Sequence, residues 1–166
     1  MSDIRDGDVY ASAIHESSHL VVARALGMTS VGIVLSHTLG SNSAVLVNYN
    51  GGTGKDLRHE MIVACAGSIG TRMIVPQYWK NEMDAHDRRD LVQTGRKLHG
   101  IKARKSTVGN EILKAELRAR EIVIRHRGDI VALTDTLMDL WDLVKAVPVD
   151  KAAPDCQERK TPDDPV

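Results

Sequence analysis

Aromatic side chains are scarce in this sequence: they make up 3% of its 166 residues, and phenylalanine is absent. The hydrophobic fraction is nevertheless 42%, so a core must be built mainly from Leu, Ile, Val, Ala and Met. Such a composition suits packed helices better than a β-sandwich, which draws on aromatic and β-branched residues. A length of 166 residues fits one domain. We therefore expect a single, mainly helical (α+β) domain.

Cysteine and long apolar runs are also scarce. The two cysteines, Cys65 and Cys156, lie far apart in an apolar and a polar segment, so we expect reduced thiols and no disulfide framework. No apolar run reaches the roughly 18 residues of a transmembrane helix. The first dozen residues are polar and acidic, unlike a signal peptide. The sequence therefore predicts a soluble, cytoplasmic protein.

Excess charge of either sign is lacking as well, because 22 Lys and Arg balance 22 Asp and Glu. A net charge of zero supplies no global field that would recruit nucleic acid or a membrane. Two basic stretches, residues 102–105 and 118–127, are the local exceptions. The second contains interspersed glutamate, and no aromatic residues stand in either to stack bases. We expect neither nucleic acid nor membrane among the partners.

The motif His15-Glu16-Ser17-Ser18-His19 is the strongest chemical signal that the sequence does contain. Residues four apart lie on one face of a helix, so two imidazoles can reach one metal ion, with Glu16 beside a bound water. This HExxH pattern is typical of zinc peptidases, in which zinc acidifies the water and the glutamate takes its proton. The plainer alternative is that these are ordinary polar residues of a half-buried helix.

The remaining pattern predicts a small β-hairpin or sheet and several helices. Asp8 and Gly27 are suited to begin and end the motif helix, Pro76 to end the next long helix, and Asn110 to cap a later one. The last two helices are expected to form an antiparallel pair. The domain should span residues 1–146, and the proline-rich, charged stretch 147–166 should be a disordered tail. The expected helices are 9–26, 56–74, 84–98, 110–126 and 129–144, and the expected strands are 31–35 and 44–49.

A catalytic zinc ion typically has three protein ligands, so the two histidines need a partner. The metzincin extension fails because Val22 and Ala25 stand where its glycine and third histidine would be. Spacing alone leaves several alternatives open. They are Glu60, Glu82, Asp84, His86, Asp87 and Asp90.

The order of these segments resembles the peptidase domain of the FtsH-type, membrane-bound ATP-dependent zinc proteases over about residues 8–144. That family's His-Glu-Ala-Gly-His motif is matched by residues 15–19, with Ser18 in place of the glycine. Its Ala-Gly-Arg-Ala-Ala-Glu stretch is similar to residues 66–71, with Thr71 at the acidic position. Its strand segment resembles residues 31–40, and its closing helices resemble residues 120–127 and 133–140.

The resemblance also implies the third ligand. In the family an aspartate opens a helix and is followed by small or apolar residues four, five and eight positions later. Asp87 fits that frame through Leu91, Val92 and Gly95, whereas Asp84 would place Arg88 at the first apolar position. The resemblance thus implies a zincin-like domain in which His15, His19 and Asp87 hold Zn²⁺ and Glu16 is the catalytic base.

The implied activity is that of a zinc metalloendopeptidase acting on unfolded or flexible polypeptide. The chain looks like a stand-alone relative without the family's ATPase and membrane anchor, so a separate unfoldase or adaptor is an expected partner. A monomer or small homo-oligomer is expected, because in the family the ATPase module contributes to ring assembly. The alternative is a non-catalytic, zinc-stabilised protein-interaction domain, in which the metal site is kept but substrate is bound without being cut.

Overall fold

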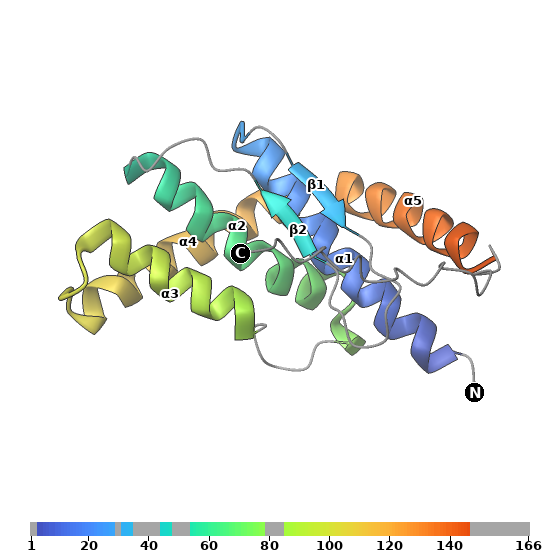
Figure 1. Cartoon of the computed structure of the whole chain (residues 1–166), viewed down its shortest axis with the longest axis horizontal. Helices are drawn as coiled ribbons and strands as arrows, with labels where there is room; N and C mark the ends of the chain where they lie inside the picture. The colour runs from blue at the N-terminus through green and yellow to red at the C-terminus, as the bar shows by residue number, and fades with distance from the viewer. Residues whose placement is uncertain (1–2, 29–30, 35–43, 48–53, 79–84, 147–166) are drawn as a thin grey trace, which may run out of the picture.

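The computed structural model describes residues 3–28, 31–34, 44–47, 54–78 and 85–146. Helices dominate these ranges, as the composition predicts (Figure 1). The elements in chain order are α1 (Asp3–Ala25), β1 (Val31–Val34), β2 (Ala44–Val47), α2 (Gly54–Ile74), the short 3₁₀ helix η1 (Pro76–Tyr78), α3 (Ala85–His99), α4 (Lys105–Arg125) and α5 (Arg127–Ala146).

The helices α1 and α2 form the centre of the molecule. The helix α1 packs on α2 along one side and on α5 along another, while α2 also contacts α3 and α4. The core therefore lies around these two helices, and its fully buried side chains include Ile14, Val22, Met61 and Ile130. A hydrogen bond between the buried hydroxyls of Thr134 and Ser17, 3.0 Å long, joins α5 to the motif helix.

Two helix starts differ from the sequence-based prediction. The helix α1 begins at Asp3, so Asp8 lies within it and is not its N-cap. The helix α4 begins at Lys105, five residues before the predicted cap Asn110, and its N-cap residue Arg104 makes no side-chain capping bond. A glycine inside a helix costs only about 1 kcal/mol relative to alanine, so Gly7 and Gly109 did not stop either helix.

The predicted antiparallel pair of C-terminal helices is wrong. Only His126 separates α4 from α5, and its backbone closes the end of α4 by donating to the carbonyl of Ile122. An antiparallel helix pair needs a connection of about two to five residues to reverse the chain. The two helices therefore diverge, and α4 packs chiefly on α2 whereas α5 packs on α1 (Figure 1).

The strands β1 and β2 pair antiparallel, with Val31 opposite Val47 and Val34 opposite Ala44. Both lie beside α1. Their predicted connection, residues 35–43, and the predicted tail, residues 147–166, fall outside the described residues. Within the part of the chain that is described, no helix is both long and apolar enough to cross a membrane.

Candidate metal centre

The motif helix presents its polar residues in different directions. His15 and His19, one turn apart, bring their ring nitrogens Nε2 to within 3.0 Å of each other. Their rings stand at 79° to one another, so they meet at their edges and do not stack. Ser17 points toward α5, where it meets Thr134. The two imidazoles therefore lie on a different side of α1 from the Ser17–Thr134 hydrogen bond that joins α1 to α5.

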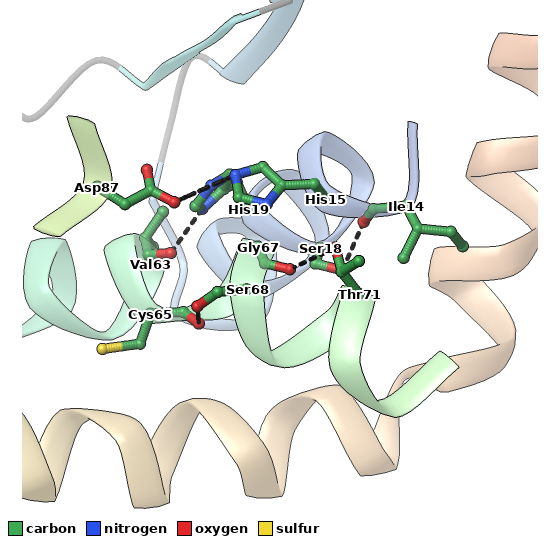
Figure 2. A network of polar contacts seen from close by, with 10 residues as sticks. All are labelled: Ile14, His15, Ser18, His19, Val63, Cys65, Gly67, Ser68, Thr71 and Asp87. Atoms are coloured by element: carbon green, nitrogen blue, oxygen red, sulfur yellow. Dashed lines mark hydrogen bonds and ion pairs between the residues drawn. The ribbon is translucent and has the colours of Figure 1, made fainter. Parts of the chain in front are cut away.

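The third group comes from the first turn of α3. The carboxylate oxygen Oδ2 of Asp87 lies 3.1 Å from His15 Nε2 and 3.4 Å from His19 Nε2. Figure 2 shows this side chain reaching from α3 toward both rings. Among the described residues, these three form the group of ligand-type side chains that is able to hold a metal ion.

The helix α2 also contributes to the metal centre. Its glycine Gly67 lies directly against the two rings, and a Cβ atom added there would be 2.5 Å from both Nε2 atoms. One turn earlier, the carbonyl of Val63 lies 2.6 Å from His19 Nδ1. The helix α2 therefore supplies both the space for the rings and a partner that orients one of them (Figure 2).

The bond to Val63 determines which nitrogen of His19 is available. A carbonyl only accepts, so Nδ1 must carry the hydrogen, and in the neutral ring Nε2 then presents a lone pair. That lone pair faces the Asp87 carboxylate, whose buried Oδ2 makes no hydrogen bond despite its short distances to the rings. Unpaired acceptors in contact repel one another, whereas a shared cation would satisfy them.

The charges in this pocket favour an ionised carboxylate. Burial alone would raise the pKa of Asp87, but the imidazoles of His15 and His19 hold it well below its usual range. Burial likewise would lower the pKa of His19, but the neighbouring Asp87 and Glu16 carboxylates raise it above the ordinary value. Glu16 is itself buried, at 9% exposure. Two carboxylates therefore act on the protonation of His19, and Asp87 is the one in contact with its ring.

The spacing of the three donor atoms fits zinc. Tetrahedral ligands at the usual Zn–N and Zn–O lengths lie about 3.3 Å from one another. The observed separations are 3.0, 3.1 and 3.4 Å. Two histidines and one carboxylate are also a donor set that catalytic zinc sites use, with a further position left for water. The residues present therefore fit a zinc ion.

The other sequence-derived candidates for the third ligand do not join this group. Glu60 lies on α2 and is 3.5 Å from the hydroxyl of Thr94. Asp90 is exposed on α3, one turn beyond Asp87. Glu82, Asp84 and the side chain of His86 lie outside what the structure describes. Of the described candidates, Asp87 alone reaches both histidines.

Ser18, which departs from the family motif, is accommodated by a glycine on the facing helix. Its hydroxyl donates to the Ile14 carbonyl at 2.7 Å, and its side chain fills the space that a Cβ of Gly70 would need. Gly70 therefore leaves room for the Ser18 side chain, and the two helices approach closely there. The sequence pattern did not predict the contact between Ser18 and Gly70, which depends on how α1 packs on α2. It also missed the Val63 carbonyl, because a backbone acceptor leaves no signal in the sequence.

Replacing Gly67 with alanine is expected to abolish zinc binding. The new methyl group would occupy the place where the edges of His15 and His19 meet, so the rings must separate or α2 must move away. Either change exceeds the roughly 0.2 Å tolerance of metal–ligand distances. Zinc content of the purified variant, measured by plasma mass spectrometry, checks this. Full zinc occupancy in Gly67→Ala would contradict the geometry of the site.

The control is Gly70→Ala, one turn further along the same face of α2. Its methyl group meets Ser18 and not the histidines, so zinc should be retained while the free energy of unfolding falls by about 1–3 kcal/mol. Adding Ser18→Gly should restore most of that loss. Urea denaturation of both single variants and the double variant measures the coupling. Simple additivity would show that these two residues do not compete for one space.

Comparison with known proteins adds no further identification, since the sequence matches no protein-family model and no curated protein. The likeness to FtsH-type peptidases drawn from the motifs therefore stays a prediction. The functional argument accordingly depends on the geometry of the three side chains and of Glu16.

Proposed function

We propose that this protein is a zinc-dependent endopeptidase that cuts unfolded or flexible polypeptide, related to the FtsH-type peptidase domain. The observation that supports this most is the convergence of His15, His19 and Asp87, in which a buried carboxylate oxygen makes no hydrogen bond. Two imidazole nitrogens lie 3.1 and 3.4 Å from that oxygen, and one shared cation would satisfy all three atoms. Glu16 follows the first ligand directly in sequence, as the HExxH chemistry requires.

In this proposal His15, His19 and Asp87 hold the metal. A bound zinc ion supplies Lewis acidity, which polarises the scissile carbonyl and makes an attacking water more acidic. The Val63 carbonyl keeps His19 in the tautomer that offers Nε2, and thereby positions one ligand without touching substrate. Gly67 of α2 leaves the space that the rings of His15 and His19 occupy.

Glu16 is the group proposed to move protons. It stands between His15 and His19 in the sequence of α1, and its carboxylate helps to raise the pKa of the His19 ring. From there it accepts a proton from the attacking water and delivers it to the leaving amine. The reaction is hydrolysis, so water's oxygen joins the carbonyl carbon and the peptide C–N bond breaks.

The proposed substrate class follows from the strands. An extended polypeptide can pair with β1 or β2, which lie beside α1 and pair with no third strand among the described residues. Pairing of this kind requires a segment whose backbone is exposed, as in loops and unfolded chains. We propose that folded substrates reach this cytoplasmic protein through a separate unfoldase or adaptor.

The deciding experiment measures metal and cleavage together. Wild-type protein freed of adventitious metal should hold about one zinc per chain and cleave a fluorescently labelled unfolded polypeptide. Chelation should stop cleavage, and added zinc should restore it. Protein that holds zinc, yet leaves every unfolded polypeptide intact while capturing a partner, would be the non-catalytic interaction domain. Protein that retains no zinc would overturn the metal centre itself.

A further inference from the structure

The turn between α3 and α4 exposes an apolar side chain among cations. Ile101 is 90% exposed, the highest value among the described large hydrophobic side chains, of which the next is 56%. It follows Gly100, whose φ of 89° turns the chain at the end of α3. Nothing within the described residues covers Ile101, so it projects from the tip of the turn.

The residues around this tip carry positive charge only. Residues 96–105 contain no aspartate or glutamate, although the whole chain has zero net charge. All five cations in this segment are exposed, and none forms an ion pair with a described residue. They are Arg96, Lys97, Lys102, Arg104 and Lys105. The balanced overall charge therefore conceals a local excess of five.

Nearby carboxylates do not neutralise this excess. Glu111, on the adjacent face of α4, is buried and is engaged by Lys114 at 2.7 Å and Arg58 at 3.4 Å. Both of those cations are more than half exposed and extend the positive surface. Glu60 is near Lys97, but it is partly buried between α2 and α3 beside Thr94. The tip itself therefore faces solvent as a cationic surface with an apolar centre.

We infer that this turn, residues 96–105, docks the protein onto an anionic lipid surface, with Ile101 entering the interface and the surrounding cations contacting headgroups. Each lysine or arginine near such a surface strengthens attraction, and a buried apolar side chain adds to it. Nucleic acid is the less favoured partner, because the segment has no aromatic residue to stack on bases and an exposed isoleucine gains little there. The zero net charge of the chain had led us to expect no membrane partner, and the local charge of this turn is the reason for the different inference.

The position of the turn leaves the metal centre accessible. Asp87 stands in the first turn of α3, and the docking turn follows the last turn of that helix. The twelve residue-to-residue steps of helix from Asp87 to His99 span about 18 Å. Figure 1 shows the turn at the end of the molecule opposite the start of α1. Docking through it would therefore hold the protein at a surface with its candidate site free.

The test is sedimentation of the full-length protein with vesicles of phosphatidylcholine containing about one third phosphatidylserine. Wild type should bind these vesicles and not pure phosphatidylcholine. The double variant Lys102→Glu/Arg104→Glu should lower the partition constant at least about thirtyfold, since each cation contributes about fivefold. Ile101→Ser should lower it roughly tenfold through the lost apolar contact.

Matched controls are available elsewhere on the surface. Arg120→Glu/Arg127→Glu changes the net charge equally on exposed helix positions, and Leu140→Ser removes an exposed apolar side chain of α5. Both control variants should bind like wild type. The inference is overturned if wild type ignores anionic vesicles, if the control charge reversal weakens binding equally, or if Ile101→Ser has no effect. Retention on DNA or RNA without vesicle binding would overturn it in favour of a nucleic-acid surface.

Discussion

Replacing Asp87 with alanine is expected to abolish stable zinc binding. Its Oδ2 is one of three donor atoms that lie within 3.4 Å of one another, and the remaining two imidazoles cannot hold a catalytic zinc ion alone. Loss of an outer partner of a ligand already costs about 10- to 100-fold in affinity, so loss of a ligand should cost more. Zinc content and peptidase activity should therefore disappear together.

The most direct measurement is the effect of zinc on thermal unfolding. A ligand that binds only the folded state stabilises it by about 4 kcal/mol when present at roughly a thousand times its Kd. Wild type should therefore unfold at a higher temperature when zinc is added, and Asp87→Ala should not. The same variant should show little zinc in plasma mass spectrometry.

Two further variants test whether Asp87 has been assigned correctly. Asp90→Ala removes the same charge from an exposed position one turn along α3, and it should bind zinc like wild type. His86→Ala addresses the rival ligand next to Asp87 in sequence. If zinc were lost in His86→Ala but kept in Asp87→Ala, the histidine would be the third ligand.

The sequence predicted part of the candidate site from local geometry. Because His15 and His19 are four residues apart in a helix, their meeting at one edge follows from the helical repeat alone. Asp87 is different, since it lies 68 positions beyond His19 and reaches it only because α3 begins beside α1 in the folded chain. Spacing could not choose it among six candidates. The family resemblance selected it, and the structure places it against both rings.

The fold shows the same division between local and non-local information. The predicted helix at 56–74 and the one at 84–98 agree with α2 and α3 within two residues, because apolar periodicity and Pro76 act locally. The predicted starts of α1 and α4 were wrong. Asp8 and Asn110 have good capping chemistry, but both helices begin earlier in the chain, at Asp3 and Lys105. The pairing of α4 with α5 was wrong because each helix packs on a different partner. Capping residues compete with packing that the sequence pattern does not reveal.

Replacing Glu16 with glutamine is expected to stop catalysis while leaving the metal in place. The amide has nearly the same shape as the carboxylate but cannot accept the proton of the attacking water. Removing a general base of this kind typically lowers kcat by about a hundred- to ten-thousandfold. Glu16 is not among the three donor groups, so the ligand set is unchanged.

The charge of Glu16 also predicts how zinc affinity will respond. Glu16 helps to raise the pKa of His19, and a protonated imidazole cannot bind a metal ion. Removing that charge lowers the pKa of His19, so protons compete less with zinc. The same charge also attracts the metal ion, so the two effects oppose each other. Glu16→Gln should therefore keep its zinc, which separates it from Asp87→Ala.

The measurement pairs zinc content with the rate of cleavage of the labelled unfolded polypeptide. Glu121→Gln is the matched control, because this exposed glutamate pairs with Arg118 on α4, away from the motif helix. It should cleave at the wild-type rate. If Glu16→Gln retained zinc and also cleaved at that rate, another group would have to be the base. A large loss of rate with full zinc occupancy would separate proton transfer from metal binding and assign the former to Glu16.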